Sequence, residues 1–141
     1  MTAIRETILA AVEAALNATS ALEVERMPSG DPARFPALHI HDDGQSQTEA
    51  EVYASRQTLA LSIEGFVEGS GGTAAHTALN ALHAEAVQAI CALENPAANI
   101  EVIEPGDLRI AAAALASARR LAFSQDFAIT FAHRRGDPET L

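Results

Sequence analysis

The sequence predicts an α+β fold in which a mostly antiparallel sheet packs against two main helices on one face. The clearest observation is the run 121–133, where apolar and polar side chains alternate. Side chains of a strand point to opposite faces in turn, so Phe123, Phe127, Ile129 and Phe131 share one face, which we expect to be buried. Two amphipathic helical patterns, one at the start of the chain and one near its middle, supply the helices.

The composition indicates one ordinary domain and excludes several classes of protein. The 141 residues are 48% hydrophobic but only 4% aromatic, so the core must be mainly aliphatic with five Phe. A formal net charge of -10 argues against binding to nucleic-acid phosphates, because such affinity comes from Lys and Arg that displace counterions. No run approaches about 18 apolar residues, so we expect no membrane span and no membrane partner.

The first third of the chain predicts one helix and two strands. Apolar side chains recur every three or four residues over 4–16, and Thr2 is the expected N-cap of this helix. Alternation over 22–27 predicts a short strand, which a segment rich in Pro and Gly terminates. A second strand is expected over 37–41, followed by an Asp-Asp-Gly turn and a polar loop that together occupy 42–50.

The next part of the chain predicts a long strand, a helix and a strand pair. Alternation returns over 53–67, and the glycine-rich break 68–72 separates this strand from a helix over 73–93 that Asn95-Pro96 would end. Two short strands are expected around a turn at Pro105-Gly106-Asp107. We interpret the alanine-rich stretch 111–120 as a connection into the final strand.

The final strand and the tail after it complete a single domain that spans residues 1–141. Gln125 is the only polar member of the core-facing set in that strand. The opposite face, made of Ser, Asp, Thr and Ala, is left for solvent or a partner. Residues 134–141 form a short polar C-terminal tail.

Two histidines near the second strand are the best metal candidates. His39 and His41 project to one side of a strand and precede Asp42-Asp43, and imidazole with carboxylate suits zinc or manganese. No further ligand arrives at a diagnostic spacing. Because both histidines lie opposite the apolar side chains of the strand, the simpler interpretation is a solvent-facing or interface side. We therefore assign no metal and no cofactor.

No other pattern indicates catalysis. Gly69-x-Gly71-Gly72 precedes a helix as in a phosphate-binding loop, but the Lys and Ser/Thr of a Walker motif are missing. His76 and His83 lie seven residues apart, which is not a zinc-binding spacing, and we expect them at the surface. No serine has the G-x-S-x-G context. The lone Cys91 excludes an intramolecular disulfide and fits a reducing compartment. We assign no catalytic residues and expect a protein that is not an enzyme.

Loops and arginine pairs supply the expected interfaces. The loops 42–50 and 68–72 are expected to bind partners, and the four arginines that bracket the last strand to pair with acids of an adjacent subunit. The candidate interface residues are Asp42, Asp43, Gln45, Glu68, Arg119, Arg120, Arg134 and Arg135.

Several features occur in a fixed order along the chain: a helix that ends near residue 18, a strand with Glu25-Arg26, Pro36-Ala37-Leu38 leading to Asp42-Asp43-Gly44-Gln45, and the terminal Phe127-Ala128-Ile129-Thr130-Phe131 with Gly136-Asp137-Pro138. In this combination the chain resembles the minor tail proteins of long-tailed bacteriophages, specifically the tail terminator or tail completion group.

The resemblance implies a small α+β protein that assembles as a hexameric ring, caps the tail tube, stops its polymerisation and presents the surface that docks the head. Its implied partners are other copies of itself, the tail tube protein and a head-completion or neck protein, and DNA would pass through the lumen without specific binding. The implied location is the virion tail, after assembly in the host bacterial cytoplasm. Two alternatives stay open: another neck or head-tail connector protein, and a small-ligand or metal-binding α+β enzyme.

Overall fold

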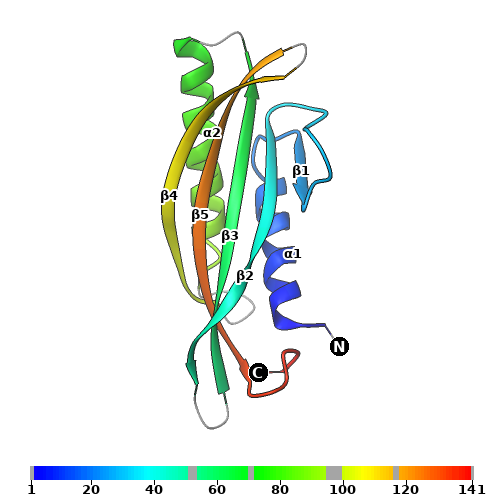
Figure 1. The fold of residues 1–141 in the computed structure, drawn as a ribbon, viewed down its shortest axis with the longest axis vertical. Helices are drawn as coiled ribbons and strands as arrows, with labels where there is room; N and C mark the ends of the chain where they lie inside the picture. The colour runs from blue at the N-terminus through cyan, green and yellow to red at the C-terminus, as the bar shows by residue number, and fades with distance from the viewer. Residues whose placement is uncertain (1, 51–53, 70–71, 95–99, 116–117, 141) are drawn as a thin grey trace.

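Five strands form one sheet, and two helices cover the same face of it (Figure 1). The computed structural model describes residues 2–50, 54–69, 72–94, 100–115 and 118–140. Within these ranges the elements are α1 (Ile4–Asn17), β1 (Glu23–Arg26), β2 (Ala37–Ala50), β3 (Ala54–Glu68), α2 (Thr73–Cys91), β4 (Ile100–Leu115) and β5 (Ala118–Arg134). The predicted α+β fold with a mostly antiparallel sheet is therefore confirmed.

The strands lie side by side in the order β1-β2-β3-β5-β4, so β1 and β4 are the two edges of the sheet. Only the β1–β2 pair is parallel, whereas β2–β3, β3–β5 and β4–β5 are antiparallel. The central β3–β5 pair is continuous from Ala54 opposite Arg134 to Glu68 opposite Arg120. This long regular pair fixes which side chains share a face across the middle of the sheet.

The hydrophobic core lies between the helices and the sheet. The alternation predicted for the last strand is confirmed, because Phe123, Phe127, Ile129 and Phe131 are all buried. The other main contributors are aliphatic: Leu38 and Ile40 of β2, Leu59, Leu61 and Ile63 of β3, Ile8, Val12 and Leu16 of α1, and Leu79, Leu82, Ala86 and Ile90 of α2.

Neither helix begins with a side-chain cap, although the sequence predicts one at Thr2. The N-cap of α1 is Ala3 and not Thr2, and the backbone N–H of Ile4 donates instead to the carbonyl of Pro138 at 2.9 Å. The C-terminal tail thus satisfies one of the free donors at this helix end, and Figure 1 shows the tail beside the start of α1. Gly72 is the N-cap of α2. The predicted stop at Asn95-Pro96 lies outside the described residues.

The prediction of a turn and a polar loop over 42–50 is wrong, because β2 runs on to Ala50. Its pairing with β3 shifts between Asp42, opposite Leu61, and Gln45, opposite Leu59. A β-bulge at Asp43 and Gly44 absorbs the extra residue, and Gly44 has the positive φ of +96° that glycine tolerates. The residues that resemble a turn therefore bend a continuous strand.

A second bulge overturns the prediction of a turn at 105–107. β4 is one strand from Ile100 to Leu115, and its register shifts between Pro105, opposite Phe127, and Leu108, opposite Gln125. The alanine-rich stretch that follows is also strand, since β4 extends to Leu115 and β5 begins at Ala118. The expected connection over 111–120 is thus mostly part of a hairpin, and residues 116–117 lie outside the described residues.

Candidate functional site

A row of polar side chains crosses the sheet on the face turned away from the helices, which we call the open face. His41, Ser62 and Asp126 lie opposite one another on β2, β3 and β5. The Nε2 atom of His41 contacts the carboxylate of Glu64. The hydroxyl group of Ser62 donates to Asp43 and is 3.3 Å from Asp126, so the row is connected across three strands.

Arg109 of β4 ends the row at the edge of the sheet. Its guanidinium donates to the two carboxylate oxygens of Asp126 at 2.8 and 2.9 Å. This contact lowers the pKa of Asp126 and raises the pKa of Arg109. A carboxylate held ionised in this way is a poor general acid at neutral pH. The row is consistent with a structural surface.

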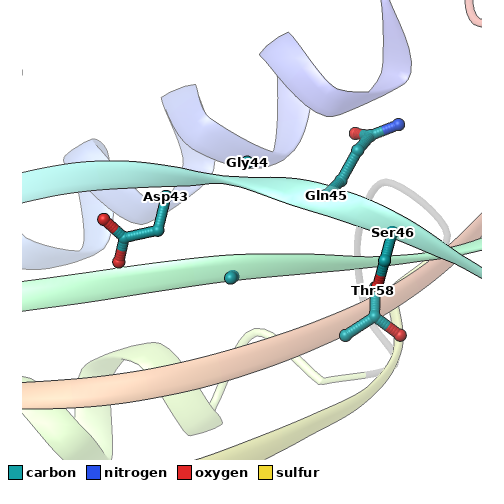
Figure 2. A pocket seen from close by; sticks show the side chains of 6 residues that line it. Asp43, Gly44, Gln45, Ser46 and Thr58 are labelled. Atoms are coloured by element: carbon teal, nitrogen blue, oxygen red, sulfur yellow. The ribbon is translucent and has the colours of Figure 1, made fainter.

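A shallow hollow of about 230 Å³ lies at one end of the open face. Figure 2 shows Asp43, Ser46 and Thr58 around it and Gln45 directed to the other side of β2. Ligand pockets usually enclose about 300 to 1,000 Å³ and bring several polar groups together. Here Asp43 is the only titratable residue of the lining. This hollow does not provide a convergent catalytic or cofactor site.

The bulge in β2 directs two of the predicted interface residues toward α1. Asp42 and Gln45 both face the helix side, where Arg5 reaches each of them, at 2.7 Å to Asp42 and 2.8 Å to Gln45. The Arg5 guanidinium lowers the pKa of Asp42. The expectation that these residues lie in a free polar loop is therefore wrong. Asp43 alone of this group lies on the open face.

We expect Asp42→Asn to lower the free energy of unfolding at pH 7 by about 1 kcal/mol, as for a partly exposed ion pair. Because the folded-state pKa of Asp42 is lowered, this contribution is present above the unfolded-state pKa, near 4, and is lost as the pH falls through the folded-state pKa. Urea unfolding from pH 7 to pH 2 measures it. The difference in unfolding free energy between Asp42→Asn and the wild type should disappear in acid. Asp107→Asn, at an exposed position, should show no such difference.

His39 is buried and does not face solvent or a partner, which corrects the prediction for this strand. Its side chain is 2% exposed, and its Nε2 lies 2.9 Å from Glu23 Oε2. Glu23 Oε1 also accepts the backbone N–H of Ala33 at 3.0 Å. Glu25 brings a second carboxylate, so that Glu23, Glu25 and His39 place ligand atoms within 4.8 Å of one another. Within the part of the chain that the structure describes, these three residues, and not His39 with His41, are the set that could hold a metal ion.

Arg120 is also buried, and the prediction that it pairs with an adjacent subunit is wrong. Its guanidinium lies 5.4 Å from the centre of the Phe35 ring and 3.5 Å from Asp31. It thereby holds the segment between β1 and β2 against the sheet. Arg134, Arg135 and Glu68 are exposed and stay available to a partner, whereas the side chain of Arg119 lies outside the described residues.

One polar network inside the core was missed by the sequence analysis. The amide of Gln125 donates to the carbonyls of Gly106 and Asp126, both at 2.9 Å, and its oxygen is 2.8 Å from Nε2 of His83. His83 is thus half-buried rather than at the surface, while His76 is exposed as predicted. The sequence signal for this network is that Gln125 is the one polar residue on the apolar face of the last strand.

Cys91 near the end of α2 is a half-buried thiol. Burial, followed by the nearby charge of Glu94, raises its pKa, which lowers the fraction of reactive thiolate.

Four large apolar side chains are exposed among the described residues: Leu22, Met27, Leu108 and Ile110. The sequence predicts a strand at Leu108 and Ile110 but does not indicate that they are exposed. Their alternation resembles that of any core-facing strand, so no local signal distinguishes them.

Neither a protein-family model nor a curated protein matches this sequence. In the described part of the chain, no helix has the length and apolar character needed to cross a membrane.

Proposed function

We propose that this chain is a structural assembly subunit that forms a closed ring, in the manner of the phage tail terminators that its sequence resembles. In this role a hexamer caps the tail tube, stops its polymerisation and presents the docking surface for the head. The observation that supports the proposal most is the open face of the sheet, which the helices leave uncovered across β2, β3, β5 and β4 (Figure 1).

The chemistry of the open face supports contact with another subunit rather than catalysis. The charged groups of the polar row contact one another, as in the Arg109–Asp126 pair, and a second ion pair farther along the sheet, Arg56–Glu101, links β3 to β4. Between these pairs β3 and β5 carry small side chains, the exposed Ala60 and the half-buried Thr58 and Thr130, whereas Glu104 of β4 is exposed. A sheet face of mostly small and paired side chains suits packing against another subunit.

The charge distribution fits a ring through which DNA passes. The net charge is -10, and among the described side chains five arginines are in ion pairs: Arg5, Arg26, Arg56, Arg109 and Arg120. These arginines are therefore partly neutralised, and the excess of carboxylates repels phosphate. DNA would pass the lumen without specific binding, and the partners would be other copies, the tube protein and a head-completion or neck protein.

The proposal is tested by adding the purified protein to tail tube protein that is polymerising. We expect shorter tubes, each with a ring at one end in negative-stain images. Tubes of unchanged length without terminal rings would contradict it.

Arg134 at the end of β5 gives a salt-dependent prediction. In the proposed ring its exposed side chain pairs with an acid of the adjacent subunit, so Arg134→Glu should weaken the oligomer more at low than at high salt, because ions screen the contribution. Light scattering in 50 mM and 500 mM NaCl compares the two conditions, because the Debye length falls from about 14 Å to about 4 Å between them. A weakening that is the same in both buffers would contradict the pairing.

A metal-binding module is the second candidate, and the arrangement of Glu23, Glu25 and His39 is the observation that favours it. Two carboxylates and an imidazole are suitable ligands for zinc. Metal analysis after equilibration with zinc tests this candidate. One bound equivalent that Glu25→Gln removes would support it, whereas no stoichiometric metal would exclude it. Glu25 is exposed, so this variant should leave the fold intact.

A further inference from the structure

β4 is one edge of the sheet, and among the described residues no strand lies on its outer side (Figure 1). It is sixteen residues long, whereas the other edge strand, β1, has four. An unpaired strand edge presents backbone N–H and C=O groups that can pair with another chain, so proteins usually protect it with charges, proline or a bulge. The protection of β4 therefore indicates where a further strand can bind.

The first half of β4 is protected. The backbone N–H of Ile103 donates to Oε2 of Glu94 at 3.0 Å, so a side chain already occupies this donor. Pro105 has no N–H, and the bulge at Gly106 and Asp107 interrupts the register directly after it. A strand added along this half would meet an occupied donor, a missing donor and a bulge.

The second half of β4, residues 108–115, has none of these features. It contains no proline, and it pairs with β5 without a register shift over its whole length. Its one charged side chain, Arg109, is in an ion pair with Asp126 on the open face. The outer side of residues 108–115 is thus a regular, unprotected strand edge, which we call the acceptor edge.

The strand register indicates which residues of the acceptor edge direct their backbone groups outward. In an antiparallel pair, alternate residues direct N–H and C=O away from the partner strand. Ile103 is such a residue, because its N–H donates to a side chain outside the sheet. It lies opposite Ile129, and Leu108, Ile110 and Ala112 lie opposite β5 residues at even steps from Ile129. Each of these three residues therefore offers an outward donor and acceptor.

The side chains of β4 form an apolar side and an acidic side. Leu108 and Ile110 are on the helix-facing side, yet they are 42% and 47% exposed. Glu104 is on the open-face side, and Asp107 is in the bulge between Glu104 and the acceptor edge. Both carboxylates are exposed, and neither is in an ion pair within the described residues. A strand that fits this edge needs apolar side chains on one side and basic ones on the other.

We propose that the acceptor edge binds an extended segment of a partner protein as an added strand, in which basic side chains alternate with apolar ones. The apolar side chains cover Leu108 and Ile110, and the basic ones lie on the side of Glu104 and Asp107. Backbone hydrogen bonds supply affinity, and the alternating side chains supply specificity. The inference goes beyond the proposed ring, since it does not depend on the oligomeric state of the chain.

A second copy of this chain is a poor occupant, because both of its sheet edges are acidic. β1 includes Glu23 and Glu25, and its one basic side chain is in an ion pair within the chain. β4 carries Glu104 and Asp107. Like charges that lie opposite each other on paired strands are destabilising. The charge of the acceptor edge therefore favours a different, basic partner.

The probe is a fluorescent peptide with blocked ends, Lys-Val-Lys-Val-Lys-Val-Lys, and fluorescence anisotropy measures its binding to the full-length chain. We expect saturable binding that weakens as the salt concentration rises, because ions screen the charges. The first control peptide has Glu in place of each Lys. The second keeps the lysines but is N-methylated at every peptide nitrogen, which removes the backbone donors without changing the charge. Neither control should bind.

A proline variant locates the probe on the acceptor edge. Ala112→Pro removes an outward N–H at an exposed position. The native Pro105, opposite Phe127 and thus also an even step from Ile129, shows that β4 accommodates proline at such a position. We expect this variant to bind the probe about tenfold more weakly or less, because a hydrogen bond is lost and the ring obstructs the added strand. Ala112→Val keeps the N–H and should bind like the wild type.

A charge variant tests the acidic side. Glu104→Gln with Asp107→Asn should weaken probe binding at low salt and reduce its dependence on salt. The matched control, Glu25→Gln with Glu139→Gln, removes two exposed carboxylates elsewhere on the chain and should bind like the wild type. Circular dichroism checks that every variant is folded.

Other results overturn the inference. Absence of binding up to about 1 mM of the lysine peptide would show that the edge accepts no such strand. Equal binding of the N-methylated peptide would mean that charge alone attracts the probe, and equal binding of the glutamate peptide would contradict the acidic side. A folded Ala112→Pro chain that binds like the wild type would place the probe elsewhere. If Ala112→Pro does not fold, the N-methylated peptide and the charge variant decide. The tube assay above tests the ring function separately.

Discussion

Gly65→Ala should lower the free energy of unfolding by about 3 kcal/mol, the upper end of the usual cost of overpacking a core. A Cβ atom at position 65 would lie 2.0 Å from Cε2 of Phe123 and 2.3 Å from Cζ. The ring cannot easily move away, because Phe123 is 1% exposed and packs edge-to-face against His83. Urea unfolding at a fixed chain concentration measures the loss, since oligomerisation makes stability depend on concentration.

The same pair provides the control for this prediction. In the Gly65→Ala background, Phe123→Leu should cost less than it does in the wild type, because the smaller side chain relieves the clash. Ala60→Val, at an exposed position on the open face of the same strand, should change stability by less than about 0.5 kcal/mol. Equal costs of Phe123→Leu in both backgrounds would contradict the proposed packing.

Gln125→Ala should lower the free energy of unfolding by roughly 2 to 4 kcal/mol. The substitution leaves the carbonyl of Gly106 and the ring of His83 without their hydrogen-bond partner. It also opens a cavity, since Gln125 is 3% exposed. Urea unfolding gives the magnitude, and amide exchange should show the largest increase near the β4 bulge at Gly106.

Ser124→Ala is the matched control for Gln125, because Ser124 neighbours it on the opposite face of β5 and is only half-buried. We expect this variant to stay within about 0.5 kcal/mol of the wild type. A Gln125→Ala protein as stable as Ser124→Ala would mean that the buried network contributes nothing to folding.

The fold class could be predicted because its signals are local. The alternation in β5 and the helical repeats of α1 and α2 are decided by side chains within a few residues of one another. These elements form where the sequence predicts them, and their apolar sides build the core. For β5, the alternation within the strand is enough to indicate which of its side chains are buried.

The bulges at Asp43-Gly44 and Gly106-Asp107 could not be predicted because their residues also suit turns. Asp43-Gly44 and Gly106-Asp107 are common turn dipeptides, and only pairing with a distant strand decides between a turn and a bulge. β3 and β5 provide that pairing partner for β2 and β4 respectively. The bulge in β2 then sets the site, since it places Asp42 and Gln45 on the same side as Arg5.

The burial of His39 and Arg120 depends on a segment without a periodic pattern. The stretch between β1 and β2 places Ala33 against Glu23, and Phe35 under the Arg120 guanidinium. Nothing in the local sequence of β2 or β5 indicates that this stretch covers His39 and Arg120. Two residues that alternation assigns to the open face are therefore buried there.

The measurement that tests the central claim most directly is the native mass of the wild-type protein, by light scattering over a concentration series. A ring of six chains predicts a single species of about 89 kDa from the 14.8 kDa chain, with a mass that does not grow with concentration. A monomer at every concentration, or a mass that rises without limit, would contradict a closed ring in solution.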